Sequence, residues 1–126
     1  LNVSTNADNG YQVFIYQRQG LLSPGAEIEP VTGTNTTPAD WLTGCPVSTS
    51  GCYGYHSGDD VLFGGSNRFL ADDSFAKLDS TAREIIHNSG PVTDEVTDVA
   101  YKIKVTDTQA NGEYQSQVVY IVVPQF

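Results

Sequence analysis

Apolar and polar residues alternate near the end of the chain and predict a β-strand over residues 99–108. The period of two is typical of a strand with one face in the core and the other in water. The apolar positions are Tyr101, Ile103 and Val105. An Asn-Gly turn separates this strand from a second apolar segment, residues 113–123, so we expect the two segments to form a β-hairpin.

The beginning of the chain predicts another hairpin, formed by residues 1–7 and 11–19. Between them, Asn9-Gly10 supplies the positive φ angles that a tight hairpin turn requires. Residues 81–88 are ambiguous, because their first four residues resemble the capping box of a helix, whereas two adjacent isoleucines and the surrounding strands favour β-structure. We interpret this segment as a strand.

The strands at both ends of the chain are apolar on two faces, which a two-layer sandwich does not require. Two explanations are open at this stage. The second face is covered either by the middle of the same chain or by a neighbouring subunit. In the second case, the predicted subunit-contact residues are Phe14, Tyr16, Val119, Ile121 and Val123.

The middle of the chain, residues 33–73, has few strand signals and many turn formers. Loops this long in small domains are usually functional or disordered, and the aromatic residues of this one predict an ordered loop. It holds the only two cysteines, Cys45 and Cys52, and we expect a disulfide that pins the loop. Three aromatic side chains could stack on the sugar rings of a glycan ligand or pack beneath the loop: Trp41, Tyr53 and Tyr55.

Composition narrows the function classes. The chain carries 15 acidic and 6 basic residues, a net charge of -9, and such a surface repels the phosphates of nucleic acid. No apolar run approaches the roughly 20 residues of a membrane span. The low charged fraction of 17%, the many hydroxyl and amide side chains and the paired cysteines indicate an extracellular protein at the cell surface.

Candidate chemistry is sparse. Two acidic pairs in Gly-rich loops could hold calcium or could be solvated turn residues: Asp59, Asp60, Asp72 and Asp73. No other cofactor is expected. Two sequons, at Asn2 and Asn35, are candidate glycosylation sites. No nucleophile-elbow motif occurs, and no pair of carboxylates stands out for glycoside hydrolysis, so we expect no enzymatic activity.

Two stretches carry a family resemblance. Residues 3–11, which read VSTNADNGY, resemble the opening segment of secreted bacterial β-sandwich surface proteins. Residues 112–126 are similar to their closing strand, in which a G-x-Y turn leads into V-x-Y-x-V-x-P. These proteins include cell-wall-associated and pilin-like domains. The resemblance implies a surface-exposed domain without catalytic residues.

Together these observations predict one domain spanning residues 1–126, an all-β antiparallel sandwich of the Ig-like or pilin-like kind with a long disulfide-pinned middle loop. The expected function is structural: a surface-layer or filament subunit that associates with copies of itself or with neighbouring surface domains. The alternative is an adhesion module that binds a carbohydrate or another host ligand. No nucleic-acid partner is expected.

Overall fold

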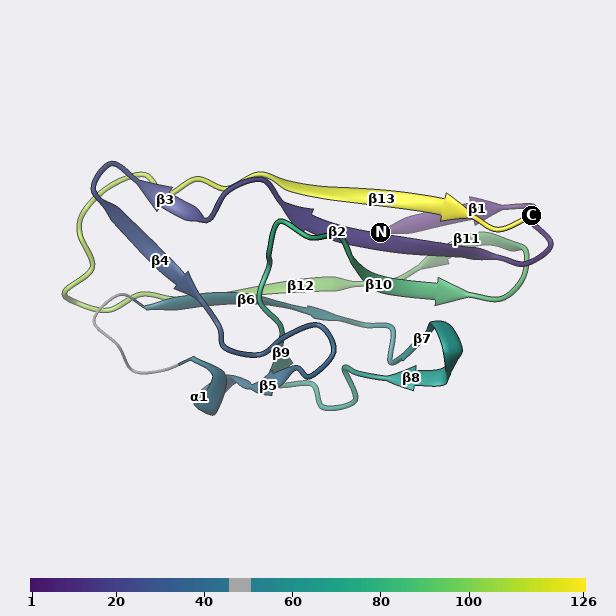
Figure 1. Ribbon diagram of the computed structural model, residues 1–126, viewed down its shortest axis with the longest axis horizontal. Coiled ribbons are helices and arrows are strands. Elements are labelled where there is room, and N and C mark those ends of the chain that lie inside the picture. Colours follow the sequence, from purple (N-terminus) through teal and green to yellow (C-terminus); the bar gives the residue numbers. More distant parts are fainter. Residues whose placement is uncertain (46–50) are drawn as a thin grey trace.

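The computed structural model describes residues 1–45 and 51–126, and strands make up nearly all of its regular structure (Figure 1). One antiparallel sheet has the strand order β10–β2–β13, and a second sheet has the order β12–β6–β4–β3. The first consists of β10 (Arg83–Asn88), β2 (Tyr11–Gln17) and β13 (Val118–Pro124). The second consists of β12 (Val99–Lys104), β6 (Cys52–Ser57), β4 (Ala26–Pro30) and β3 (Leu21–Ser23). The predictions of an all-β fold and of a strand within residues 81–88 are confirmed.

Shorter elements complete the fold. Three further pairs are β1 (Asn2–Thr5) with β11 (Val92–Val96), β5 (Ala39–Asp40) with β9 (Ser74–Phe75), and β7 (Val61–Leu62) with β8 (Ser66–Asn67). The helical turns are α1 (Trp41–Gly44) and η1 (Phe63–Gly65). Within the described ranges, no helix has the length and apolar character needed to cross a membrane.

Both predicted hairpins are wrong in their pairing. Strand β1 pairs with β11 instead of β2, while β13 pairs with β2 and β12 pairs with β6. Gly10 does have a positive φ of 76°. Glycine is required there because the backbone passes close to the end of β10, where a Cβ would lie 1.9 Å from the carbonyl oxygen of Asn88. Strand β2 is the central strand of its sheet, with β10 along one edge and β13 along the other. Burial of its inner face requires both of these neighbours, and this tertiary requirement outweighs the local hairpin signal at Asn9-Gly10.

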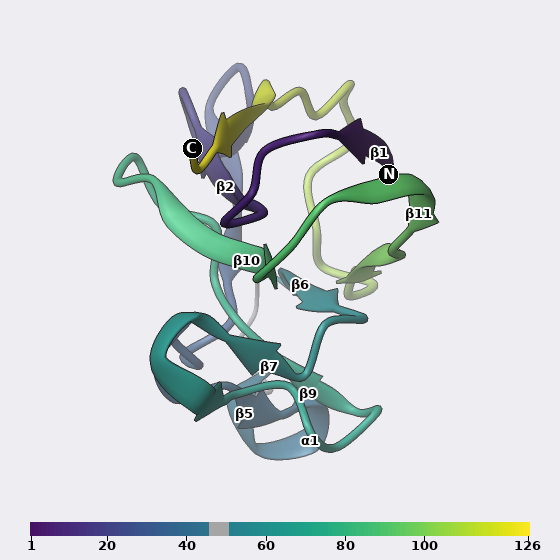
Figure 2. The same cartoon turned by 90° about the vertical axis from the view of Figure 1, so that its right-hand side faces the viewer.

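The middle of the chain is more regular than a loop. Strand β6 lies inside the second sheet, between β12 and β4, so the expectation of few strands there is wrong. Because β4 and β6 are parallel, the sheet is also not purely antiparallel; the chain crosses over between them through β5 and α1. Figures 1 and 2 both show β5, α1, β7 and β9 on the lower side of the molecule, away from β2 and β13.

The core lies between the two sheets. Its buried side chains come chiefly from β2, β6 and β10: Tyr11, Val13, Ile15, Tyr53, Tyr55, Ile85 and Ile86. A second, smaller cluster anchors the middle of the chain and consists of Val31, Trp41, Cys45, Cys52 and Phe75. The larger cluster fixes the two sheets, and the smaller one holds α1 and β9 against β6.

Candidate functional site

The five predicted contact residues lie together on the outer face of the first sheet. Phe14 is directly opposite Ile121, and Tyr16 is opposite Val119. Opposite residues of an antiparallel pair point to the same side of the sheet. Val123 follows two positions after Ile121 and shares its side. Because alternate residues of β2 are fully buried in the core, these five side chains face outward.

This outer face is apolar over β2 and β13, and on β10 it is bordered by Glu84, which lies opposite Phe14 and is only 9% exposed. Neither β2 nor β13 contains a charged residue. Ile121 is 41% exposed, and the other four side chains are partly buried by one another. Elements β5, α1, β7 and β9 lie away from β2 and β13 (Figure 2). Phe63 of η1 reaches the β10 border of the face, where its N–H donates to the Glu84 carboxylate at 3.2 Å. The role of the face in a subunit contact stays a prediction.

A second unusual surface runs along β12. Tyr101 and Ile103 lie opposite the core residues Tyr55 and Tyr53, so their side chains point toward the interior, as the alternation predicted. They are nevertheless 50% and 55% exposed, and Val105 beyond them is 60% exposed. The prediction that this row is buried is therefore wrong, because within the described ranges β12 pairs with β6 alone.

Among the described residues, the backbone of β12 is unpaired along the edge that faces away from β6. Tyr55 exchanges both of its backbone hydrogen bonds with Ala76, on the far side of β6 from β12. In an antiparallel ladder the opposite residue, Tyr101, then turns its own N–H and C=O groups away from β6, and Ile103 does the same two positions later. As far as the chain is described, β12 thus presents a free edge beside its exposed apolar row.

Strand β13 offers a matching edge. The N–H of Arg18 donates to the carbonyl of Gln117, so Val118 and Tyr120 turn their backbone groups away from β2. The hydroxyl groups of Tyr101 and Tyr120 meet in a hydrogen bond across the space between the two edges. Burial, together with this hydrogen bond, raises the pKa of Tyr101.

We call this space the β12–β13 opening. It contains an apolar cavity of about 230 Å³, floored by the core residues Tyr53 and Leu78 and walled by Ile103 and Val118. Nearer the right-hand end in Figure 1, β1 occupies the space beside β11, and its Val3 packs against the core. The sequence signalled the apolar row of β12 but not its exposure, which depends on which strands become neighbours.

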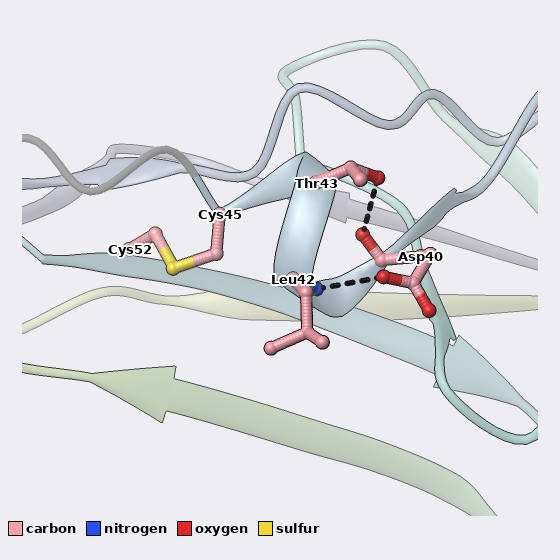
Figure 3. Close-up of a disulfide and its surroundings, with 5 residues drawn as sticks. All are labelled: Asp40, Leu42, Thr43, Cys45 and Cys52. Carbon is pink, nitrogen blue, oxygen red and sulfur yellow. Dashed lines mark hydrogen bonds between the residues drawn. A yellow bond between two sulfur atoms is a disulfide. The ribbon is translucent and has the colours of Figure 1, made fainter.

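The predicted disulfide between Cys45 and Cys52 is confirmed, with a Cα–Cα distance of 5.6 Å (Figure 3). It joins the end of α1 to the start of β6. The Asp40 carboxylate caps α1 by accepting a hydrogen bond from the Leu42 N–H at 2.9 Å, and the Thr43 hydroxyl donates to the Asp40 carbonyl at 3.2 Å. Residues 46–50 of the loop that the disulfide closes lie outside the described residues.

The three aromatic residues predicted to bind a glycan are buried, so that prediction is wrong. Trp41, Tyr53 and Tyr55 are 7%, 6% and 0% exposed, and none can offer a ring face to a sugar. Trp41 packs against Phe75 with ring centroids 5.0 Å apart, and the ammonium of Lys102 lies 4.7 Å from the Trp41 ring centroid. Trp41 anchors the middle of the chain within the smaller cluster, as the alternative predicted, whereas Tyr53 and Tyr55 belong to the core between the two sheets.

The four predicted calcium ligands do not come together. Asp59 accepts hydrogen bonds from the N–H groups of Val61 and His87, and burial raises its pKa. Asp73 instead pairs with Lys102 at 2.6 Å, while Asp60 and Asp72 are exposed. No group of three or more His, Cys, Asp or Glu side chains suited to a metal occurs in the described part of the chain.

The glycosylation prediction is wrong at Asn35 because its side-chain amide is buried. The amide nitrogen donates to the Tyr55 hydroxyl at 3.0 Å and to the Glu84 carbonyl at 2.7 Å, and its oxygen accepts from Arg68. A glycan would attach to this same nitrogen. Burial raises the pKa of Tyr55 to about 12. Asn2 is exposed on β1, and its glycosylation stays a prediction.

Comparison with known proteins gives no relative from which a function could be transferred. No family model, curated protein or solved structure matches this chain. The features of the molecule that bear on function are its two apolar surfaces, the outer face of β2 and β13 and the β12–β13 opening.

Proposed function

We propose that this protein is a non-enzymatic extracellular structural subunit of a surface layer or pilus-like filament, and that it acts by associating with copies of itself. The observation that carries the proposal is the outer face of β2 and β13, where Phe14, Tyr16, Val119, Ile121 and Val123 form one continuous apolar surface. Contiguous exposed apolar surfaces of this kind commonly mark protein–protein contacts.

The distribution of charge favours a second copy as the partner on this face. Each copy carries a net charge of -9, so two copies repel each other wherever their acidic surfaces approach. Strands β2 and β13 contain no charged residue, and the neighbouring carboxylate of Glu84 on β10 is already only 9% exposed, so apolar side chains can be buried there with little further desolvation of a carboxylate. The disulfide supports an extracellular setting, because disulfides persist in oxidising compartments.

Sedimentation velocity and negative-stain electron microscopy of the wild-type protein test this function. We expect concentration-dependent oligomers or fibres. The variant Ile121→Lys places a charge at the centre of the face and should raise the concentration needed for assembly by roughly tenfold or more. Its matched control is Leu42→Lys, which changes a side chain that is 80% exposed on α1, an element that lies away from β2 and β13.

The control should assemble like the wild type, and circular dichroism should show that both variants are folded. A wild-type protein that stays monomeric at the highest soluble concentration contradicts the proposed function. Equal assembly by Ile121→Lys and Leu42→Lys removes the outer face as the contact.

A further inference from the structure

We propose that Tyr101 and Tyr120 form an oxidative modification site, at which their two rings are joined as dityrosine within one chain. The oxidant is of the peroxide class, hydrogen peroxide acting through a haem peroxidase. The proposal goes beyond self-association, because the new bond lies within a single subunit and does not involve the outer face of β2 and β13.

The two rings project from edge strands of different sheets into the same space. Tyr101 on β12 lies opposite the core residue Tyr55, so its side chain points toward the interior. Tyr120 on β13 lies opposite the core residue Ile15 and also points inward. The two hydroxyl groups hydrogen-bond to each other across the β12–β13 opening.

This contact resembles the crosslinked product. In dityrosine, each hydroxyl stands on the ring carbon next to the new carbon–carbon bond, and the two hydroxyls are neighbours that hydrogen-bond to each other. The native hydrogen bond between Tyr101 and Tyr120 therefore already brings the two oxygen atoms into the arrangement that the product requires.

The rings have the access and the freedom that coupling needs. Tyr101 is 50% exposed, so an oxidant can reach it. Among the described residues, no backbone ladder joins β12 to β13, so the two edges can shift toward each other without breaking hydrogen bonds between them. Tyr101 also lines the apolar cavity of about 230 Å³, which leaves its ring room to turn.

The other tyrosines are placed differently. Three of them are buried, and their hydroxyls bond residues other than tyrosine: Glu95 for Tyr11, Gln17 for Tyr53 and Asn35 for Tyr55. The Tyr114 hydroxyl donates to the Ala110 carbonyl, and Tyr16 points to the outer face. As far as the chain is described, Tyr101 and Tyr120 are thus the tyrosines whose hydroxyls meet.

The composition lacks the side chains that usually react with oxidants first. Free thiols and thioethers are readily oxidised in proteins. This sequence has no methionine, and its only cysteines, Cys45 and Cys52, are joined in the disulfide. The single tryptophan, Trp41, is 7% exposed. The accessible tyrosines are therefore the side chains that a peroxidase would oxidise.

The coupling begins when each tyrosine loses one electron and its phenolic proton, which leaves two phenoxyl radicals. Each unpaired electron is shared between the oxygen and the ring carbons ortho to it. Pairing of the two electrons forms a bond between an ortho carbon of Tyr101 and an ortho carbon of Tyr120. Each of these carbons then releases its hydrogen as a proton, and each oxygen takes a proton back. In total the chain loses two hydrogen atoms, which convert one molecule of hydrogen peroxide into two of water.

The crosslink would join the two sheets at their unpaired edges. Tyr101 and Tyr120 are 19 positions apart in the sequence. Covalent closure of a loop of this length restricts the unfolded chain, as a disulfide of the same loop length would. We therefore expect the Tm of the crosslinked protein to exceed that of the unmodified protein by about 10 °C.

Oxidation of the purified protein tests the site. The wild type is treated with hydrogen peroxide and a haem peroxidase, at a concentration at which sedimentation velocity shows monomers. We expect dityrosine fluorescence and a monomer that has lost the mass of two hydrogen atoms, with Tyr101 and Tyr120 in the two joined peptides. The yield per molecule should not change on dilution, because both rings belong to one chain.

Three variants make the test specific to this pair. Tyr101→Phe and Tyr120→Phe each remove one phenol and should eliminate the crosslinked monomer. The matched control Tyr16→Phe removes a phenol on the outer face and should give the yield of the wild type. Circular dichroism should show that all three variants are folded, since each keeps its ring. Coupling of N-acetyltyrosine in a parallel reaction shows that the oxidant is active.

Three results would overturn the inference. The first is a wild-type monomer that keeps its mass while N-acetyltyrosine is coupled in the parallel reaction. The second is an equal yield of crosslinked monomer from Tyr101→Phe, because other rings would then be joined. The third is coupling that occurs only in covalent dimers, which would place the bond between copies. None of these results bears on the outer face, which is tested separately by the assembly of Ile121→Lys.

Discussion

The buried amide of Asn35 is the single polar side chain whose loss we expect to be most costly. Asn35→Ala leaves two buried acceptors without a partner, the Tyr55 hydroxyl oxygen and the Glu84 carbonyl. It also leaves Arg68 without the oxygen to which it donates. Each buried group left unsatisfied costs about 1–3 kcal/mol, although Arg68 is partly exposed and regains water. We therefore expect a loss of about 3 kcal/mol in the free energy of unfolding.

Urea denaturation and thermal unfolding, followed by circular dichroism, measure this loss. For a chain of 126 residues, about 3 kcal/mol corresponds to a fall in Tm of roughly 11 °C. Tyr55→Phe removes only the hydroxyl, and Asn35 keeps its bond to Glu84, so its cost should be nearer 1 kcal/mol. The control Asn67→Ala changes an exposed residue of β8 and should lie within about 0.5 kcal/mol of the wild type.

The reasoning would be refuted if Asn35→Ala cost less than about 1 kcal/mol while Asn67→Ala was neutral. That result would mean that water or a rearranged neighbour satisfies the groups that Asn35 now joins. The double variant with Tyr55→Phe should lose less than the sum of the single losses, because the two changes remove the same hydrogen bond. Additive losses would show that the two side chains act independently.

Two further predictions concern the disulfide and alkaline pH. The double variant Cys45→Ser with Cys52→Ser should lower the free energy of unfolding by about 2–3 kcal/mol, because the crosslink no longer restricts the unfolded chain. Reduction of the wild type should cause an equal loss, measured by urea denaturation. An unchanged urea midpoint would contradict this prediction. Burial raises the pKa of Tyr55 from 10.0 to about 12. The contribution of Tyr55 to the free energy of unfolding is therefore complete below pH 10 and decreases between pH 10 and 12, where only the unfolded chain loses the phenol proton. Absorbance at 295 nm during alkaline titration should show one late-ionising tyrosine fewer in Tyr55→Phe.

The sequence predicted properties that depend on single strands. The two faces of β2 and β13 were assigned correctly, since alternation alone places Phe14 and Ile121 on the side away from the core. The disulfide and the strand β10 were also predicted, because short spacing and adjacent isoleucines are local signals. The five outer-face residues were thus identified from the sequence, although their meeting on one surface is a property of the fold.

Pairing partners could not be predicted from local signals. The Asn9-Gly10 turn is compatible with a hairpin, but the pairing of β2 with β10 along one edge and β13 along the other decides the outcome. Strand β6 was missed because Gly54 interrupts its pattern. Yet glycine is required there, since a Cβ at Gly54 would lie 2.7 Å from Cγ2 of Val31. The exposure of Ile103 likewise depends on the absence of a neighbouring strand from the described residues, which no local pattern records.

The pairing of β13 with β2 has a consequence for how the chain folds. Val118 pairs with Gln17, so the first sheet joins segments about 100 positions apart, and the last strand of this sequence must be available before that sheet can form. Folds dominated by such distant contacts fold slowly, typically in milliseconds to seconds, because loop closure precedes any gain from contact. During synthesis, β2 would wait with an unpaired apolar edge until β13 emerged. Folding should therefore be late and cooperative, and this interval is when the chain is most exposed to aggregation.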